Sequence, residues 1–490
     1  MVNPILERRR AGILLHITSL PGEGEMGDLG ENARYFVQFL ADCSQTVWQM
    51  LPIGPVEPFT SPYQASSAFA GNPYLVDTLW LAEKGLLQPD RARQLRSTAE
   101  GRLQALGEAY RTFTAGKGLL TRVALDDFCR RHAFWLEDFA LFVVLKRRFD
   151  QKPWWEWPPQ FRDRDVKALA TVRRELHAEI GEVNFSQFVF FEQWRGFKNY
   201  ANDRGIKLFG DMPIFVAADS ADVWANRKFF LLDERGRPTV VAGVPPDAFS
   251  STGQRWGNPI YNWKALERDG FSWWIQRLSH ARELFDWIRI DHFRGFEAYW
   301  EIPASSPTAE KGRWVKVQGE KLFRTLFEAL GELPIVAEDL GTITPEVIEL
   351  RRKFHIPGML VLQFAFDGLP QNPYLPHNHT QDSVVYTGTH DNDTTLAWFE
   401  ELDESQKRYL YDYLLWSQEP MPRLLVRTAL MSPAKVAIVP MQDVLELGKG
   451  HRMNRPATLE GNWRWRFEWS WLKAEQCERL RGWTRLYGRA

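Results

Sequence analysis

Residues 284–296 read Leu-Phe-Asp-Trp-Ile-Arg-Ile-Asp-His-Phe-Arg-Gly-Phe, and this stretch contains the repeating unit of the fold. Its short, mostly apolar run Trp287–Ile290 is typical of a buried β-strand, and it ends at the polar residue Asp291. The segment before it, Phe271–Phe285, has the apolar spacing of a helix. A helix that leads into a short buried strand predicts an α/β protein with parallel strands.

The same unit recurs along the chain, which contains eight short runs typical of strands. They are Gly12–His16, Thr46–Leu51, Ile206–Gly210, Trp287–Ile290, Pro334–Ala337, Met359–Phe364, Ser383–Tyr386 and Lys435–Val439. Most are continuously apolar, as expected for parallel strands that are covered on both faces. Segments with helical spacing lie between them, at Glu31–Cys43, Phe271–Phe285, Lys321–Leu330 and Pro345–Phe354. Eight alternating strands favour a (β/α)₈ barrel, although an open sheet could also use eight strands.

The strands are unevenly spaced, which predicts large insertions in one catalytic barrel domain that spans residues 1–490. The longest gap separates the second and third runs, and residues 81–182 within it are charged with helical periodicity. We expect an inserted helical subdomain there. A second insertion, at about residues 219–262, contains a predicted hairpin at Phe229–Gly243 with its turn at Asp233–Gly236.

The bulk composition is that of an ordinary globular protein with no electrostatic preference for nucleic acid or membranes. The formal net charge is −1, and apolar residues make up 44% of 490 positions. No uncharged run approaches the roughly 18 residues needed to span a bilayer. The cysteines Cys43, Cys129 and Cys477 are odd in number and far apart, so we expect reduced thiols in a soluble cytoplasmic protein. The 22 tryptophans fit either a bulky core or flat faces that stack on sugar rings.

Four carboxylates follow predicted strands, where a barrel of this kind builds its active site. They are Asp211, Asp291, Glu338 and Asp391, and they are accompanied by Arg289, His292, His390 and Asn392. Any one of them alone has an ordinary explanation, as a turn residue or helix N-cap. Four together would repel one another at high cost, which favours a catalytic or metal-binding role.

A metal site is the first alternative for this cluster, because carboxylates and histidines bind hard cations and zinc. The chain has neither an HExxH motif nor EF-hand spacing, and Arg289 two residues before Asp291 disfavours a nearby cation. Paired carboxylates also suit glycosidic chemistry, in which one attacks the sugar carbon and another protonates the leaving oxygen. That reaction accounts for the tryptophans as well, but sequence spacing leaves retaining and inverting mechanisms open.

Several long strings of the sequence resemble the 4-α-glucanotransferases called amylomaltase or disproportionating enzyme, which are relatives of the α-amylases. The strings begin at Ser61 (SPYQ), Ala68 (AFAGNPY), Gly210 (GDMPIFV), Asp222 (DVWAN), Gly243 (GVPPD), Gly253 (GQRWGNP), Arg289 (RIDHFRGF), Ala337 (AEDLG), Thr389 (THDNDT) and Gly461 (GNWRWR). They occur in order over nearly the whole length. The resemblance implies a (β/α)₈ barrel and a retaining transfer of α-1,4-glucan segments.

The resemblance also implies a role for each matching position. Asp291 matches the nucleophile, Glu338 the general acid/base, and Asp391 the carboxylate that holds the donor sugar and stabilises the transition state. The implied substrate-binding residues are Tyr63, Asp211, Asp247, Gln254, Trp256, Arg289, His292, His390 and Asn462. Trp256 lies on the loop that covers the acceptor side in the family.

The expected substrates are α-1,4-glucans (maltooligosaccharides, starch and glycogen), with glucose as a further acceptor. No cofactor and no metal are expected, since the sequence has neither a Gly-rich nucleotide loop nor a P-loop. Two alternatives stay open, a hydrolase of the same fold and a glucan-binding protein without activity. The sequence departs from the family at Val56–Thr60 and at Ala248, near the glucan-binding loops and away from the catalytic trio.

Overall fold

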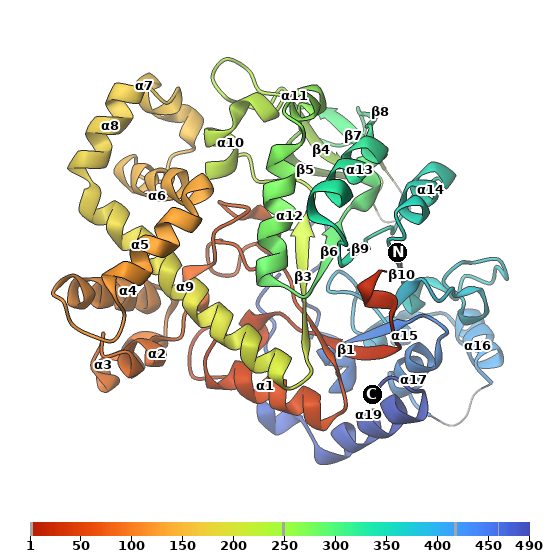
Figure 1. Cartoon of the computed structure of the whole chain (residues 1–490). Coiled ribbons are helices and arrows are strands. Elements are labelled where there is room, and N and C mark those ends of the chain that lie inside the picture. The colour runs from red at the N-terminus through yellow and green to blue at the C-terminus, as the bar shows by residue number, and fades with distance from the viewer. Residues whose placement is uncertain (1–2, 247–249, 416–418, 459) are drawn as a thin grey trace.

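The computed structural model describes residues 3–246, 250–415, 419–458 and 460–490. At its centre is an eight-stranded parallel sheet in the order β10-β11-β12-β1-β2-β3-β6-β9 (Figure 1). The strands are β1 (Arg10–Leu14), β2 (Val47–Gln49), β3 (Lys207–Pro213), β6 (Trp287–Asp291), β9 (Ile335–Ala337), β10 (Gly358–Val361), β11 (Ser383–Tyr386) and β12 (Val436–Pro440). The two end strands approach each other, since Ala337 N donates to Pro357 O at 2.9 Å. The sheet is therefore a nearly closed barrel, and the predicted fold class is confirmed.

The strands form where they were expected because their residues are buried on both faces. All residues of β11 and β12 are buried, with no alternation of exposed positions. Gly210, just before Asp211, shows how closely a helix packs on this barrel. A Cβ at that position would lie 2.2 Å from the ring of Phe285, so only glycine lets the end of α12 (Ser272–Leu284) approach β3 this closely.

Helices cover the outside of the barrel, and the four predicted ones form within about two residues of their expected bounds. They are α1 (Glu31–Asp42), α12 (Ser272–Leu284), α13 (Gly319–Leu330) and α14 (Pro345–Lys353). The other α-helices are α2 (Thr78–Glu83), α3 (Pro89–Arg96), α4 (Ala99–Thr114), α5 (Arg122–Arg131), α6 (Ala133–Arg148), α7 (Pro159–Arg162), α8 (Val166–Glu175), α9 (His177–Asp203), α10 (Ala221–Ala225), α11 (Trp263–Arg268), α15 (Thr395–Glu401), α16 (Glu404–Tyr413), α17 (Arg423–Met431), α18 (Met441–Val444) and α19 (Ala474–Leu486).

A lobe of helices, α2 to α8, lies to one side of the barrel, and the long helix α9 returns from it to β3 (Figure 1). Trp154 and Trp157, which lie between α6 and α7, are almost fully buried and therefore serve packing. We propose that residues 1–490 form one catalytic domain, with this lobe and the region at 219–262 as its two main insertions.

The second insertion belongs to a small antiparallel sheet that the sequence did not predict. Its order is β5-β4-β7-β8, with β4 (Val240–Val244), β5 (Gln254–Pro259), β7 (Ala298–Pro303) and β8 (Arg313–Lys316). The expected turn is present, since Gly236 N donates to Asp233 O at 3.0 Å. The hairpin arms, however, make only the isolated bridge Leu232–Pro238, because β4 pairs with β5 and β7.

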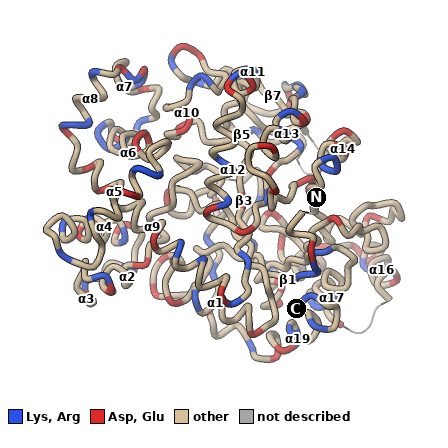
Figure 2. Tube along the Cα trace, viewed as in Figure 1, with Lys and Arg blue, Asp and Glu red and all other residues tan. Residues whose placement is uncertain are grey.

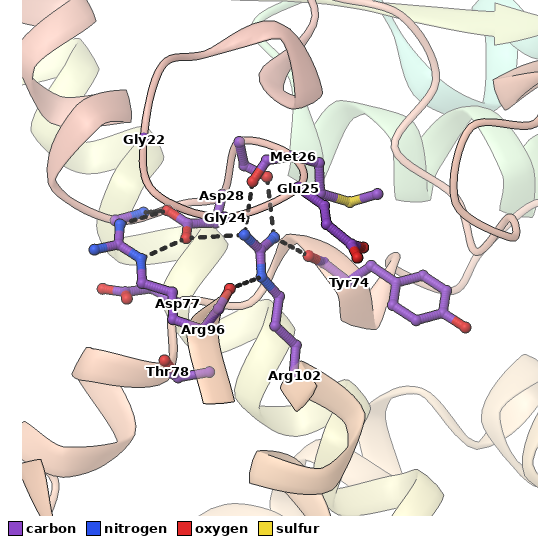
Figure 3. Close-up of polar contacts among 12 residues, drawn as sticks. Gly22, Gly24, Glu25, Met26, Asp28, Tyr74, Asp77, Thr78, Arg96 and Arg102 are labelled. Carbon is purple, nitrogen blue, oxygen red and sulfur yellow. Dashed lines mark hydrogen bonds and ion pairs between the residues drawn. The ribbon is translucent and has the colours of Figure 1, made fainter. Parts of the chain in front are cut away.

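A buried network of charges, here called the junction cluster, joins the first barrel loop to the helical lobe (Figure 3). It consists of Asp28, Asp77, Arg96 and Arg102. Arg96 holds Asp28 through Nε–Oδ2 at 2.9 Å and Nη2–Oδ1 at 3.1 Å. Arg102 is 1% exposed, and its Nη1 and Nη2 groups donate to the carbonyl oxygens of Gly27, Tyr74 and Met26. The cluster fixes the loop that follows β1 against α3 and α4.

The expectation of three reduced thiols is wrong for two of them. Cys43, at the end of α1, and Cys477, in α19, form a disulfide with their Cα atoms 5.2 Å apart, whereas Cys129 is free. The two positions are 434 residues apart in sequence. Their pairing follows from the packing of α1 against α19, so residue spacing could not reveal it.

Positions of Lys and Arg and positions of Asp and Glu are interspersed along the trace in Figure 2, and neither sign gathers on one part of the molecule in that view. This distribution agrees with the formal net charge of −1. Within the described residues, none of the helices combines the length and the apolar character required to cross a membrane.

Candidate active site

Strand register places three of the four candidate carboxylates on one edge of the barrel. Asp211 of β3 lies opposite Arg289 of β6, and Ile290 lies opposite Ala337 of β9. Asp291 and Glu338 follow Ile290 and Ala337 directly in sequence, so they leave neighbouring strands at the same level. Asp391 reaches the same edge from the loop after β11.

Arg289 links two of these carboxylates. Its Nη1 is 2.6 Å from Asp211 Oδ2, and its Nη2 is 2.9 Å from Asp291 Oδ1. Burial alone would lower the Arg289 pKa, but Asp211 and Asp291 outweigh it and raise this pKa well above the ordinary value. The guanidinium is therefore a permanent cation at the position where a bridging metal ion would otherwise lie.

Asp291 and Glu338 both favour a proton more than ordinary carboxyl groups do. Burial raises the pKa of Asp291, Arg289 opposes this, and the charges of Asp211 and Glu338 raise the pKa further. Burial likewise raises the pKa of Glu338, again against Arg289. Repulsion among these buried carboxylates disfavours their simultaneous ionisation. The contact with Arg289 favours the ionised form of Asp291, against burial and the charges of Asp211 and Glu338.

The backbone after β6 orients Glu338. His292 N donates to Glu338 Oε2 at 2.7 Å, and Leu340 N donates to Oε1 at 3.1 Å. His292 has a φ of +54°, an uncommon conformation for a residue other than glycine. Such a conformation persists where surrounding contacts hold it, often at a functional site. Here it aims the His292 N–H at the carboxyl group.

Asp391 is held from a distant part of the chain. Asn454 Nδ2 donates to Asp391 Oδ1 at 2.6 Å, and Arg452 Nη2 donates to its backbone oxygen. The loop that carries Asp391 is itself anchored by buried Asp443, whose Oδ2 accepts from Thr387 Oγ1 at 2.6 Å. Sequence reasoning missed Asn454, Arg452 and Asp443. The signal that could have found them is their place after β12, the last barrel strand in the chain, since Asp443 lies in α18 and the other two lie in the loop that follows it.

Tyr63 and His390 connect Asp391 with Asp211. Tyr63 Oη donates its only proton to Asp211 Oδ2 at 2.7 Å, so the His390 Nε2–H, 2.8 Å away, donates to Tyr63 Oη. The two rings are stacked with centroids 5.5 Å apart. Burial lowers the pKa of His390, which keeps the ring neutral. A chain of hydrogen bonds thus runs from His390 through Tyr63 and Asp211 to Arg289, whose ion pair continues it to Asp291.

Comparison with known proteins places this arrangement in a family. The family described as 4-alpha-glucanotransferase matches residues 15–472. The chain belongs to the 4-alpha-glucanotransferase family. Its activity class is that of a glycosyl-transferring enzyme of the glycoside hydrolase type, and the resemblance stated from the sequence motifs is confirmed.

Similar proteins match over almost their whole length. The 4-alpha-glucanotransferase of Thermus thermophilus is 51% identical over 96% of this chain and 97% of its own. That of Synechocystis is 46% identical over 99% of each chain. A solved amylomaltase from Streptococcus agalactiae, in complex with acarbose, covers 99% of this chain at 38% identity, and all of its own chain is matched, with a TM-score of 0.95.

The candidate acceptor residues of this glucanotransferase family member lie on the small antiparallel sheet. Trp256, on β5, packs edge-on against His292 with ring centroids 4.8 Å apart, and its Nε1 donates to Gln254 Oε1 at 3.1 Å. The acceptor-side residues therefore touch the chain directly after the candidate nucleophile. Asp247, also predicted from the motifs, lies outside the described residues.

Asn462 does not touch the four carboxylates. Its Oδ1 accepts from Arg455 N at 2.8 Å, and its Nδ2 donates to Thr458 O at 3.0 Å. These bonds close the loop that carries Asn454. Asn462 thus fixes this loop, and the contact with substrate that the sequence motif implies for it stays a prediction.

A small cavity lies behind Asp211, between the loop at residues 52–70 and α12. It encloses about 80 Å³ and is bordered by Tyr63 and Asp211. Asp211 Oδ1 is buried without a hydrogen-bond partner in the protein. A space of this size beside an unpaired carboxylate oxygen can hold ordered water.

Proposed function

We propose that the chain transfers segments of α-1,4-glucan from a donor to the 4-hydroxyl group of an acceptor glucan or of glucose, with retention of configuration. The observation that carries this proposal is the placement of two carboxyl groups at one edge of the barrel, Asp291 paired with Arg289 at 2.9 Å and Glu338 held by the N–H groups of His292 and Leu340. Maltooligosaccharides, starch and glycogen are the proposed substrates, and the cytoplasm is the proposed location.

In the first step, ionised Asp291 attacks the anomeric carbon of the donor sugar. Its Oδ1 is engaged by Arg289, which leaves Oδ2 to form the new bond to carbon. The bond from that carbon to the glycosidic oxygen breaks, and Glu338 gives its proton to the departing oxygen. Asp391, held by Asn454, binds hydroxyl groups of the same sugar and stabilises the positive charge that develops on it.

In the second step, Glu338 accepts the proton of an incoming hydroxyl group. The oxygen of that group bonds to the anomeric carbon, and the ester bond to Asp291 breaks. Hydrolysis results if the incoming molecule is water, and transfer results if it is a glucan. Trp256 and Gln254 support transfer, because an aromatic face beside His292 can bind an acceptor sugar and exclude water.

Incubation of the purified protein with maltotriose tests the proposal. Transfer gives free glucose together with a series of longer maltooligosaccharides, because each segment removed from one chain extends another. Only glucose and maltose would identify a hydrolase, and no reaction would identify a glucan-binding protein. Chromatographic separation of the products distinguishes these outcomes.

A donor with a good leaving group separates the roles of the two carboxyl groups. An α-maltosyl fluoride needs no proton on its leaving group, so Glu338→Gln should still form the glycosyl-enzyme from it while losing activity on maltotriose. Asp291→Asn should fail with both donors. Mass spectrometry of the protein detects the covalent adduct, and equal behaviour of the two variants would refute the assignment.

A further inference from the structure

A group of potential metal ligands lies outside the catalytic cluster, where the helical lobe meets the barrel. Among the residues that the structure describes, His132, His280 and Glu283 form the group whose ligand atoms all lie within 4.8 Å of one another. His132 occupies the junction between α5 and α6, and His280 and Glu283 are one turn apart on α12. The proposed catalytic reaction uses none of them.

His280 is oriented as a metal-binding histidine usually is. Its Nε2 lies 2.8 Å from the backbone oxygen of Phe69, so this nitrogen carries the proton and Nδ1 keeps a free electron pair. Nδ1 faces Glu283 Oε2 at 4.0 Å. A hydrogen bond from the second ring nitrogen to a carbonyl group fixes the tautomer and ring orientation in many metal sites.

His132 is also buried and available in its neutral form. It is 7% exposed, packs against the rings of Phe128 and Phe191, and lies with its ring centroid 5.9 Å from that of His280. Burial lowers the pKa values of both histidines to about 4, so neither is charged at neutral pH. Trp135 Nε1 donates a weak hydrogen bond to His132 Nδ1 at 3.3 Å. This bond must be given up if His132 Nδ1 is to act as a ligand.

Glu283 supplies the negative charge of the group, and its exposed side chain can rotate towards a bound ion. Its side chain is 64% exposed, whereas the two histidine side chains are held by the core. Ligand atoms around a tetrahedral zinc ion lie about 3.4 Å apart, given bonds of about 2.1 Å. The separations, which reach up to 4.8 Å, must therefore shorten by as much as about 1.4 Å, through rotation of the exposed carboxylate and a shift of the histidine rings towards each other. Burial raises the pKa of Glu283, and the nearby charges of Arg131 and Lys198 partly offset this.

We propose that His132, His280 and Glu283 bind a late first-row divalent cation such as Zn²⁺, with water at a fourth position. Two imidazoles and one carboxylate are the donor set that such ions prefer over Mg²⁺ or Ca²⁺. The ion would tie the α5–α6 junction of the lobe to α12, the helix that precedes catalytic strand β6 (Figure 1).

Cobalt titration of the full chain, after treatment with a chelator, tests this site. We expect one Co²⁺ per chain with the intense visible absorption of tetrahedral cobalt, displaced by an equivalent of Zn²⁺. Glu283→Gln and His132→Gln should each weaken binding by about 100-fold or more, since even the loss of an outer hydrogen-bonding partner commonly costs 10–100-fold. Zn²⁺ should also raise the melting temperature of the parent protein and leave that of Glu283→Gln unchanged.

Two controls keep the result specific to this group. Glu137→Gln and His177→Gln remove exposed residues of the same types from α6 and α9, and both should bind Co²⁺ as the parent does. Glu283→Gln leaves the four catalytic carboxylates intact, so cobalt bound there would persist in this variant. The proposal is overturned if tetrahedral absorption is absent from the parent, or if Glu283→Gln binds Co²⁺ with the affinity of the parent.

Discussion

The junction cluster and the catalytic cluster are both buried groups of charged side chains, but they differ in the balance between negative and positive groups. The junction cluster has two carboxylates and two guanidinium groups, and Arg102 donates to several backbone oxygens (Figure 3). In the catalytic cluster, Asp211, Asp291, Glu338 and Asp391 gather around Arg289.

The imbalance has chemical consequences at the catalytic edge. Burial raises the pKa values of Asp291 and Glu338, the charges of neighbouring carboxylates add to this effect, and Asp211 Oδ1 lacks a partner. The junction cluster, with equal numbers of carboxylates and guanidinium groups, holds two parts of the chain together, whereas the catalytic cluster keeps bonding capacity for a substrate. Substitutions in the catalytic cluster should therefore change mainly the reaction rate, and substitutions in the junction cluster should change mainly the stability of the fold.

Asp291→Asn gives the largest expected effect. Loss of the nucleophile should lower kcat on maltotriose by about 10⁴-fold or more. The melting temperature should stay the same or rise, because one of several mutually repelling charges is removed. Product chromatography and thermal unfolding measure the two quantities. Retained activity, or a sharp drop in melting temperature, would mean that Asp291 serves structure, as the junction residues do.

Arg102→Leu should have the opposite profile. Removal of one partner from a buried ion pair commonly costs about 3–5 kcal/mol of folding free energy, and here the carbonyl oxygens of Gly27, Met26 and Tyr74 also lose their donor. The kcat of the folded fraction should stay near that of the parent. Urea unfolding measures the loss, and Arg93→Leu, in an exposed pair with Asp90, is the matched control. A large loss of kcat with unchanged stability would refute the assignment of the junction cluster to stability and of the catalytic cluster to rate.

Asn454→Ala should lower kcat by about 10–100-fold, with little change in stability. The variant removes a hydrogen bond to the charged Asp391, an interaction worth about 1.5–3 kcal/mol. Since Asn454 positions Asp391, the fall should appear mainly in kcat and less in KM. Glu460→Gln changes an exposed residue of the same loop and should leave both constants unaltered. Equal losses in the two variants would show that the loop as a whole, and not the Asn454 amide, is responsible.

Asp77→Asn should produce the smallest effect, one that depends on pH. Burial and the nearby charge of Asp28 raise the Asp77 pKa from 3.8 to about 6. Because the folded state binds this proton more tightly than the unfolded state, ionisation destabilises the fold increasingly as the pH rises from about 4 through 6. Asparagine keeps the N-cap acceptor for Leu79 N but carries no charge.

The variant should therefore be more stable than the parent by about 1–3 kcal/mol at pH 7.5, and equal to it near pH 4. Thermal unfolding at the two pH values measures the difference. A stabilisation that is the same at both would mean that the charge of Asp77 is fully compensated within the junction cluster.

The eight strands could be predicted because each is a short run of apolar residues buried on both faces. The carboxylates at their ends could be predicted as neighbours, since parallel strands of a barrel end on one rim. The small sheet was missed because β5 and β8 are largely exposed and polar, without the continuous apolar run that marks the barrel strands.

The sequence by itself determined the α/β class, the order of strands and helices, and the set of polar residues at the active edge. These features depend on local periodicity and on motif strings, and both involve only residues that are close together in the sequence. The family's division of roles among Asp291, Glu338 and Asp391 came from the same strings and stays a proposal to be tested.

Only the tertiary structure decided which distant groups meet. The pairing of Cys43 with Cys477, the hold of Asn454 on Asp391, and the meeting of His132 with His280 each join residues far apart in the chain. Such contacts depend on strand register and on the packing of helices against one another, which only the collapse of the whole core fixes. The same packing buries Asp291 and Glu338 and so raises the pKa values of both carboxyl groups.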